Sequence, residues 1–309
     1  MKKIRTDLAL EAHQMCATEK VGELNGIKVD EDADGNIKIT KIDVLNEEGS
    51  NALGKPMGRY VTVESTEIKY DLEVYEKTCI ILSKLIREMT GESEKTLVVG
   101  LGNKQITPDA LGPLVIEKLM VTGHIKEGSE EVFGDEISSV YALAPGVLGT
   151  TGIESAEVIK GVVERVKPDV VIAVDALASR SIDRISTTFQ ISDTGINPGS
   201  GVDNKRKALS EETLGVKVIA IGVPTVVDAK TVAIESIDTA LEKMGNKDID
   251  ETKKGDLIKE HIADEIGTFM VTPKDIDMVI EKTSKTVANG INLALHKNLT
   301  FRDIEGYVG

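Results

Sequence analysis

Short apolar runs rich in β-branched residues alternate along this chain with stretches of helical periodicity. The four clearest runs occupy residues 96–101, 139–144, 169–175 and 216–221. Such alternation is typical of βαβ units, in which crossover helices connect the buried strands of a parallel sheet. We therefore predict an α/β fold with a mainly parallel central sheet flanked by helices, and we expect all four runs to share that sheet.

The remaining elements follow from the same periodicity. Apolar residues at helical spacing predict helices over 70–90, 111–120, 152–166, 227–243 and 273–296. Residues 1–60 form a polar lead-in with peripheral β elements, among them a strand near 37–42, and residues 185–191 suggest an additional strand at an antiparallel edge. Residues 245–270 are charged and irregular, which indicates a surface insertion.

The charge balance argues against one broad class of function. Lysine and arginine total 37 against 52 for aspartate and glutamate, which gives a net charge of −15. Duplex DNA binders need a basic face, and single-strand binders need aromatic platforms, whereas aromatic residues make up 3% here and tryptophan is absent. We expect no direct nucleic-acid partner. The acidic balance suits a basic peptide substrate or simple solubility.

Cysteine use and hydropathy indicate the compartment. Cys16 and Cys79 form no CxxC pair, so we interpret them as ordinary reduced thiols, although one disulfide is arithmetically possible. The basic N-terminus has no apolar core of a signal peptide, and no apolar run approaches the ~18 residues of a membrane span. We therefore expect a cytoplasmic protein with no membrane partner.

Two aspartates follow strands of the predicted sheet. Asp109 lies in the glycine-containing loop after residues 96–101, and Asp175 ends the run at 169–175. Ligands of open α/β sheets bind beyond the carboxyl ends of the strands, so both carboxylates should reach the same rim. Two neighbouring carboxylates can share one proton and activate a water against an amide carbonyl. Each has a structural alternative: Asp109 could cap the following helix, and Asp175 could bind loop N–H groups.

Three further motifs have competing interpretations. Asp193 lies in D-T-G, the signature of pepsin-like proteases, but that fold is all-β and needs a second copy of the motif. The loop at Gly146 resembles a phosphate loop without its Gly-Lys-Ser/Thr, although a helix N-terminus there could hold an anion. Lys205 and Arg206 could grip an acidic substrate side chain or lie in a solvated loop. The four histidines have no spacing typical of metal ligands.

Long strings of the chain resemble one known family. They are TLVVGLGNKQITPDALGP, APGVLGTTGIES, PDVVIAVDALASR, ISDTGINPGSGVDNKRKALSEETLGV, VIAIGVPTVVDA and FMVTPKDIDMVIEKTSKTVANGINLALH. Together they look like the germination protease of spore-forming bacteria. The resemblance implies an aspartic-type endopeptidase that initiates the degradation of small acid-soluble spore proteins during germination, in the forespore or spore core.

The resemblance also assigns site residues. The family's catalytic aspartates fall on the Asp of TPDALGP, which is Asp109, and on the Asp of AVDALA, which is Asp175. The family is similar in fold to the hydrogenase maturation endopeptidases, which bind nickel with a third, histidine ligand. No histidine lies in a matching loop of this sequence, so we expect no metal and no cofactor.

A processing site is implied near the N-terminus. The family is made as an inactive zymogen that removes its own propeptide, and RTDLALE resembles its processing site, with the cut between Asp7 and Leu8. This implies a propeptide over residues 1–7 and a single α/β peptidase domain over 8–309, with an irregular insertion at about 245–270. Lys205 and Arg206 are candidates for the pocket that reads the acid before the cut. The resemblance further implies a homotetramer.

Two other classes of function remain open on the sequence. A catalytically inactive α/β protein could bind a small molecule or nucleotide through the loop at Gly146, and a non-catalytic assembly scaffold would need no carboxylate pair. A single specific cut in a small acid-soluble spore protein would favour the peptidase, and nucleotide titration tests the binder.

Overall fold

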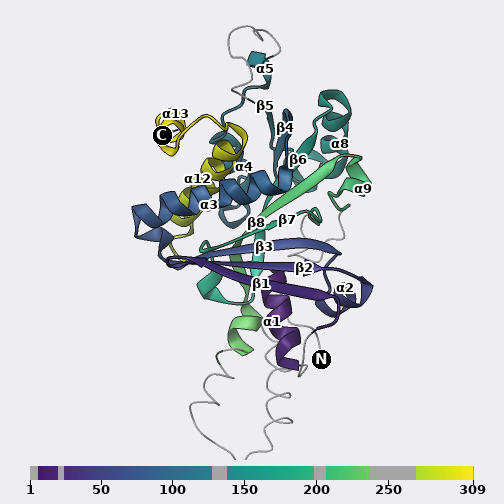
Figure 1. The fold of residues 1–309 in the computed structure, drawn as a ribbon, viewed down its shortest axis with the longest axis vertical. Coiled ribbons are helices and arrows are strands. Elements are labelled where there is room, and N and C mark those ends of the chain that lie inside the picture. Colours follow the sequence, from purple (N-terminus) through teal and green to yellow (C-terminus); the bar gives the residue numbers. More distant parts are fainter. Residues whose placement is uncertain are drawn as a thin grey trace, which may run out of the picture.

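The computed structural model describes residues 6–19, 24–126, 138–197, 207–234, 236 and 269–308. Within these ranges the strands form one nine-stranded sheet in the order β1-β2-β3-β7-β8-β6-β4-β5, with β9 paired to β8 (Figure 1). Among the helices of the same ranges, none combines the length and hydropathy that a bilayer crossing requires.

The predicted runs form the parallel half of the sheet. This half consists of β5 (Ser139–Leu143), β4 (Lys95–Gly100), β6 (Val170–Ser179) and β8 (Lys217–Asp228). The prediction that these runs share a parallel sheet flanked by helices is confirmed. β6 and β8 extend beyond the predicted runs because their pairing continues to Ser179 and Val227.

The other half of the sheet is antiparallel. It consists of β1 (Ile27–Asp34), β2 (Ile37–Val44), β3 (Gly58–Ser65) and β7 (Thr188–Ser192). The predicted peripheral N-terminal β elements are therefore present, and β1, β2 and β3 continue the central sheet at one end. The edge position expected for 185–191 was wrong. β7 lies between β3 and β8, because Tyr60 to Glu64 pair with Ser192 to Thr188, far away in sequence.

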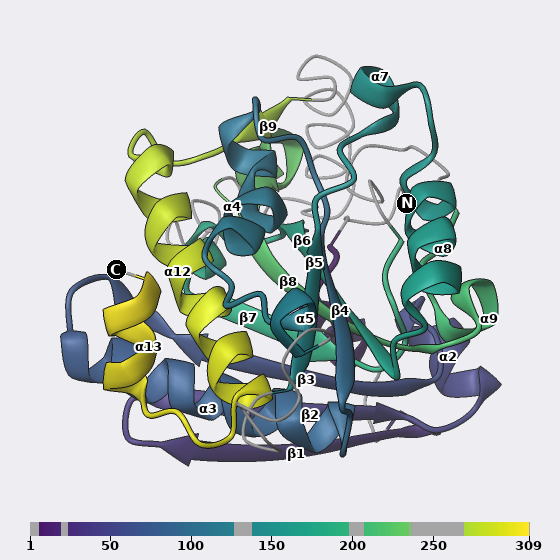
Figure 2. The same cartoon turned by 90° about the horizontal axis from the view of Figure 1, so that it is seen from above.

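Helices cover both faces of the sheet (Figure 2). One face packs against α3 (Leu72–Thr90), α4 (Leu111–Glu117), α12 (Ile276–Leu295) and α13 (Phe301–Val308). The opposite face packs against α8 (Ser155–Val166) and α9 (Glu211–Leu214) in the parallel half, and against α1 (Ala9–Glu19) and α2 (Glu47–Leu53) in the antiparallel half. The described ranges also contain short elements: α5 (Gly123–Lys126), α7 (Leu148–Thr151), β9 (Met270–Val271) and the 3-10 turns η1 (Thr66–Lys69), η2 (Thr107–Asp109) and η4 (Ile182–Arg184).

Most predicted helices are confirmed. Those expected at 70–90, 111–120, 152–166 and 273–296 correspond to α3, α4, α8 and α12, although α12 begins at Ile276, after Pro273 rather than with it. Asp71 caps α3, and Gly91 ends it as predicted. The helix expected over 227–243 begins only after β8 ends at Asp228, and its residues 235 and 237–243 lie outside the described ranges. The same holds for residues 245–268 of the expected insertion.

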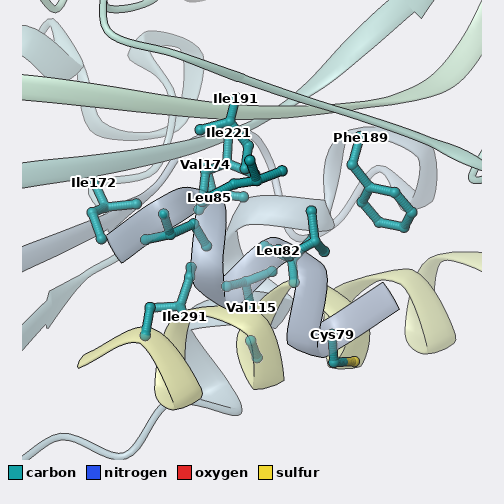
Figure 3. Packing of buried hydrophobic residues seen from close by; sticks show 14 of the residues in the cluster. Cys79, Leu82, Leu85, Val115, Ile172, Val174, Phe189, Ile191, Ile221 and Ile291 are labelled. Atoms are coloured by element: carbon teal, nitrogen blue, oxygen red, sulfur yellow. The ribbon is translucent and has the colours of Figure 1, made fainter. Parts of the chain in front are cut away.

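The larger apolar core closes the face of the sheet under α3 and α12. Val174, Ile191 and Ile221 from three strands pack there with Leu82 of α3 and Ile291 of α12 (Figure 3). Fully burying an aliphatic side chain of this size stabilises the fold by about 1.5–3 kcal/mol. Because this face is filled, a site must lie at the carboxyl ends of the strands or on the opposite face.

Candidate active site

The loop after β4 folds back on itself and carries Asp109. Gly102 has φ +111°, and a Cβ there would lie 2.0 Å from the carbonyl oxygen of Asp109, so this close approach requires glycine. The N–H of Asn103 donates to Asp109 Oδ2 at 2.7 Å. Asp109 ends η2, and α4 starts after Ala110 with no side-chain cap. The helix-cap alternative for Asp109 is therefore wrong.

Asp175 lies inside β6. It is opposite Gly222 of β8, is 6% exposed, and its Oδ1 accepts from the N–H of Ala176 at 2.9 Å. That N–H belongs to the next residue of the same strand rather than to a separate loop. This hydrogen bond fixes one carboxylate oxygen against the backbone of its own strand.

The segments that carry the two aspartates are neighbours in space. β4 and β6 are parallel, and the N–H of Leu101 donates to the carbonyl of Val174 at 2.8 Å, which extends their pairing to the residue before Asp175. The turn η2, which contains Asp109, packs against both β6 and β8. The pairing of the two strands therefore brings both aspartate-bearing segments to one end of the sheet, as the strand-end argument predicted.

Asp175 also shares a row of the sheet with Gln190. Gln190 of β7 pairs with Gly222 of β8, and Gly222 pairs with Asp175 of β6. Their neighbours Val174 and Ile191 belong to the core under α3 and α12, so both polar side chains point to the opposite face. Two strand spacings, roughly 10 Å, separate the ends of this row.

The predicted processing site lies across this face. The N–H of Asp7 donates to the carbonyl of Ala178 at 3.0 Å, and the N–H of Ala178 donates to Asp7 Oδ2 at 2.9 Å. Gln190 accepts at Oε1 from the N–H of Ala9 at 2.7 Å and donates from Nε2 to the carbonyl of Asp7 at 3.4 Å. Leu8 and Ala9 are fully buried. The bond after Asp7 is therefore held between β6 and Gln190.

A second carboxylate of this segment is buried in a polar site. Glu11 accepts from the N–H groups of Arg180 at 2.7 Å and Ser181 at 3.2 Å, and it pairs with Arg184 Nε at 3.1 Å. Arg184 also pairs with Glu64 at 2.6 Å. These five residues help to line a cavity of ≈ 290 Å³. Acidic side chains of the N-terminal segment are thus matched by N–H groups and a guanidinium.

Sequence reasoning missed the groups that hold the bond after Asp7. Lys205 and Arg206, expected to read the acid, lie outside the described residues. In the part of the chain that the structure describes, Lys55 Nζ donates to the carbonyl of Asp7 at 2.8 Å. Burial lowers the pKa of the Lys55 ammonium, and the charges of Asp7 and Glu11 oppose that effect.

Other expected features lie apart from this site. Asp193 of the D-T-G sequence accepts from the N–H of Arg59 at 2.8 Å in a loop of an α/β protein, so the pepsin-like alternative is wrong. The loop at Gly146 leads into α7, which is a single turn. Cys16 and Cys79 are free thiols. Among the described residues, no three histidine, cysteine, aspartate or glutamate side chains are grouped to hold a metal ion.

Similarity to known proteins covers nearly the whole chain. The family model described as germination protease matches residues 6–252 and 246–308. The chain belongs to the germination protease family. It is therefore a peptidase. The germination protease of Clostridium perfringens is 44% identical over 324 residues, which cover 100% of each chain. That of Clostridium tetani is 46% identical over 320 residues and 99% of each chain.

More distant proteins are also similar. The germination protease of Halalkalibacterium halodurans is 39% identical over 360 residues, which cover 98% of this chain and 96% of that protein. The NiFe hydrogenase maturation protease HycI from Thermococcus kodakarensis KOD1 is similar with a TM-score of 0.35 and 18% identity, over 67% of this chain and 98% of that one. Asp7, Asp109 and Asp175 all lie within the residues matched by the germination protease model.

Proposed function

We propose that this germination protease is an aspartic-type endopeptidase, made as a self-processing zymogen, that initiates the degradation of small acid-soluble spore proteins during germination. The observation that carries the proposal is the position of residues 6–11 across the face that holds Asp175, with residues 8–11 buried there. A segment in this position covers the end of β6 and so keeps other substrates away. The same position presents the segment's own bond to the proposed catalytic residues. Latency and self-cleavage then have one structural origin.

The proposed mechanism uses Asp109 and Asp175 as a pair that shares one proton. The ionised carboxylate takes a proton from a water, the water attacks the carbonyl carbon, and the protonated carboxyl donates to the leaving nitrogen. The two groups titrate as a unit, so neither is permanently the acid or the base. The proposed reaction involves no metal and no cofactor.

The contacts of the N-terminal segment suggest the substrate pattern. Asp7 lies before the bond to be cut and accepts from Ala178, and Glu11 lies four residues later beside Arg184. We propose that a spore protein takes the place of this segment and presents acidic side chains at the same two positions. Lys205 and Arg206 stay candidates for further contacts with such a substrate. Removal of residues 1–7 would precede this exchange.

The proposal also covers the location and the oligomeric state of the enzyme. We place its action in the spore core and propose a homotetramer, both on the strength of the family resemblance. Light scattering on the purified chain tests the tetramer.

The decisive experiment compares two forms of the chain. The full-length chain and a chain that begins at Leu8 are each incubated with a small acid-soluble spore protein, and the products are identified by mass spectrometry. We expect the shorter form to make a single cut after an acidic residue and the longer form to cut far more slowly. Absence of cleavage by both forms, together with calorimetric binding of a nucleotide, would instead favour a binding protein.

A further inference from the structure

The carbonyl oxygen of Asp7 accepts from two side chains. Lys55 Nζ donates to it at 2.8 Å, and Gln190 Nε2 donates to it at 3.4 Å. Lys55 also reaches the carbonyl of Thr6 at 3.4 Å. Most buried carbonyls bond to backbone N–H groups, so a carbonyl that faces an ammonium and a side-chain amide calls for an explanation. It is also the carbonyl of the bond proposed for processing.

The backbone around Lys55 is fixed. Its N–H donates to the carbonyl of Ser50 at 3.2 Å, and its carbonyl accepts from the Ser50 hydroxyl at 2.7 Å. Gly54, with φ 66°, ends α2 and directs the chain into this position. Burial lowers the pKa of Lys55, and the carboxylates of Asp7 and Glu11 oppose that effect. The structure thus places an ordered amino group, a hydrogen-bond donor, at one particular carbonyl.

Gln190 is oriented by its second contact. Because its Oε1 accepts from the N–H of Ala9 at 2.7 Å, its Nε2 is the atom that faces Asp7. The amide therefore spans the bond after Asp7, with its donor on the carbonyl before the bond and its acceptor on an N–H beyond it. Gln190 stands in the same row as Asp175, with Gly222 between them. The face that holds the carbonyl is the face to which Asp175 points.

We propose that Lys55 and Gln190 form the site that stabilises the oxyanion when the bond between Asp7 and Leu8 is hydrolysed. Water adds to the carbonyl carbon of Asp7, the π electrons move to the oxygen, and the resulting O⁻ accepts from both side chains. When the C–N bond breaks, the electron pair returns from the oxygen, and the nitrogen of Leu8 takes a proton from the aspartate pair. A carboxylic acid and an amine result, with one water consumed. The inference rests on the proposed function, because it requires this chain to cut its own bond.

A purely structural role for the two side chains leads to a different expectation. Side chains that only anchor the N-terminal segment would, on removal, loosen it and leave processing as fast as before or faster. Donors to a developing negative charge act mainly in the transition state, and loss of one such donor typically slows a reaction about a hundred- to a thousandfold. The rate of the cut at an unchanged bond therefore separates the two roles.

The experiment follows the appearance of chains that begin at Leu8 in purified full-length protein, by mass spectrometry. Lys55→Met removes the cation at similar length. Gln190→Glu keeps the acceptor for Ala9 but replaces the donor by a negative charge. Lys217→Met, at the exposed start of β8, is the matched control. We expect both site variants to be slowed about a hundredfold or more, and the control to process at the wild-type rate.

The outcomes separate the inference from the proposed function. Wild-type rates in folded Lys55→Met and Gln190→Glu overturn the inference alone. A wild-type chain that never loses residues 1–7, or an Asp175→Asn chain that still loses them when free of other proteases, overturns the proposed function and the inference with it. Circular dichroism and the thermal midpoint report whether each variant is folded. If Lys55→Met does not fold, Gln190→Glu and the charge-retaining Lys55→Arg decide the question. Lys55→Arg should then keep more of the wild-type rate than Gln190→Glu.

Discussion

Asp7 and Ala178 exchange two hydrogen bonds: the backbone N–H of Asp7 donates to the carbonyl of Ala178 at 3.0 Å, and the N–H of Ala178 donates to the carboxylate of Asp7 at 2.9 Å. The aspartate side chain thus supplies the acceptor that a backbone carbonyl would supply in an added β-strand. For the proposed cut, recognition of the acid before the bond and alignment of the chain along β6 are therefore the same contact.

The proposed pair of catalytic aspartates can be tested by isosteric substitution. Asp109→Asn and Asp175→Asn each remove a charge and keep the shape, so we expect cleavage of a spore protein to fall about a hundred- to ten-thousandfold. Asp193→Asn is the matched control. Its Oδ1 can still accept from the N–H of Arg59, so this variant should retain substantial activity. Full activity in either of the first two variants would refute the pair.

The glycine that allows Asp109 its position should be needed for activity. In Gly102→Ala the new Cβ would meet the Asp109 carbonyl at 2.0 Å on a backbone with φ +111°, so the loop must shift. A displacement of about 1 Å at a catalytic group can cost about a hundredfold in rate. Gly161→Ala in α8 meets nothing within 4 Å and should leave kcat unchanged while it stabilises the helix by about 0.5–1 kcal/mol. Equal kcat values in the two variants would contradict this prediction.

The buried ion pair of Arg184 should matter more for stability than an exposed one. Its side chain is 14% exposed and pairs with Glu11, which is 3% exposed, so Arg184→Met leaves a buried carboxylate without its cation. We expect the free energy of unfolding in urea to fall by about 3–5 kcal/mol. Arg59→Met breaks a pair in which the arginine is 43% exposed, and should cost about 1 kcal/mol or less. A smaller loss at Arg184 than at Arg59 would speak against the buried pair.

Stability should decline as the pH falls below about 6.5. Burial lowers the pKa of His296, which is fully buried and bonds the carbonyl of Met120 at 3.2 Å. In the window between the lowered folded pKa and the unfolded value near 6.5, the unfolded chain binds the extra proton, so acidification favours unfolding. The loss approaches about 1.4 kcal/mol per pH unit for one such histidine.

Denaturant titrations at pH 7.5 and 5.5 measure this effect. His296→Gln should reduce the difference in unfolding free energy between the two pH values. His13→Gln should also reduce it, because burial lowers the pKa of this partly exposed histidine as well. An unchanged difference in the His296→Gln variant would show that this histidine is not the group responsible.

The parallel half of the fold could be predicted because its signals are local. Each buried strand is a continuous apolar run, and each helix between runs has its own periodicity. The carboxyl ends of parallel strands lie at one edge, so the approach of the segments bearing Asp109 and Asp175 follows from strand order alone. The full length of the strands was harder to predict, because β6 continues past Asp175 only where its partner β8 continues beside it.

The antiparallel half depends on contacts that no local pattern records. Nothing near residues 27–65 indicates that β3 pairs with β7, so no sequence pattern linked Lys55 to the proposed processing bond. One signal was available for Gln190. It is polar between the apolar residues Phe189 and Ile191, and such alternation marks a strand with one face different from the other. What that face meets, however, is set by an N-terminal segment more than 170 residues away, with Ala9 and Gln190 separated by 181 positions.

The complete burial of Leu8 gives the proposed cut a direction. Hydrolysis turns the uncharged bond between Asp7 and Leu8 into a carboxylate on Asp7, beside the amino group of Lys55, and an ammonium group on Leu8. A buried ammonium without water is unfavourable by several kcal/mol unless it keeps a partner. The new chain end therefore gains free energy by moving into solvent and drawing the following residues off the sheet. Return of the segment would require the charged terminus to lose its water again. The proposed cut is therefore effectively irreversible, and the face that holds Asp175 stays uncovered.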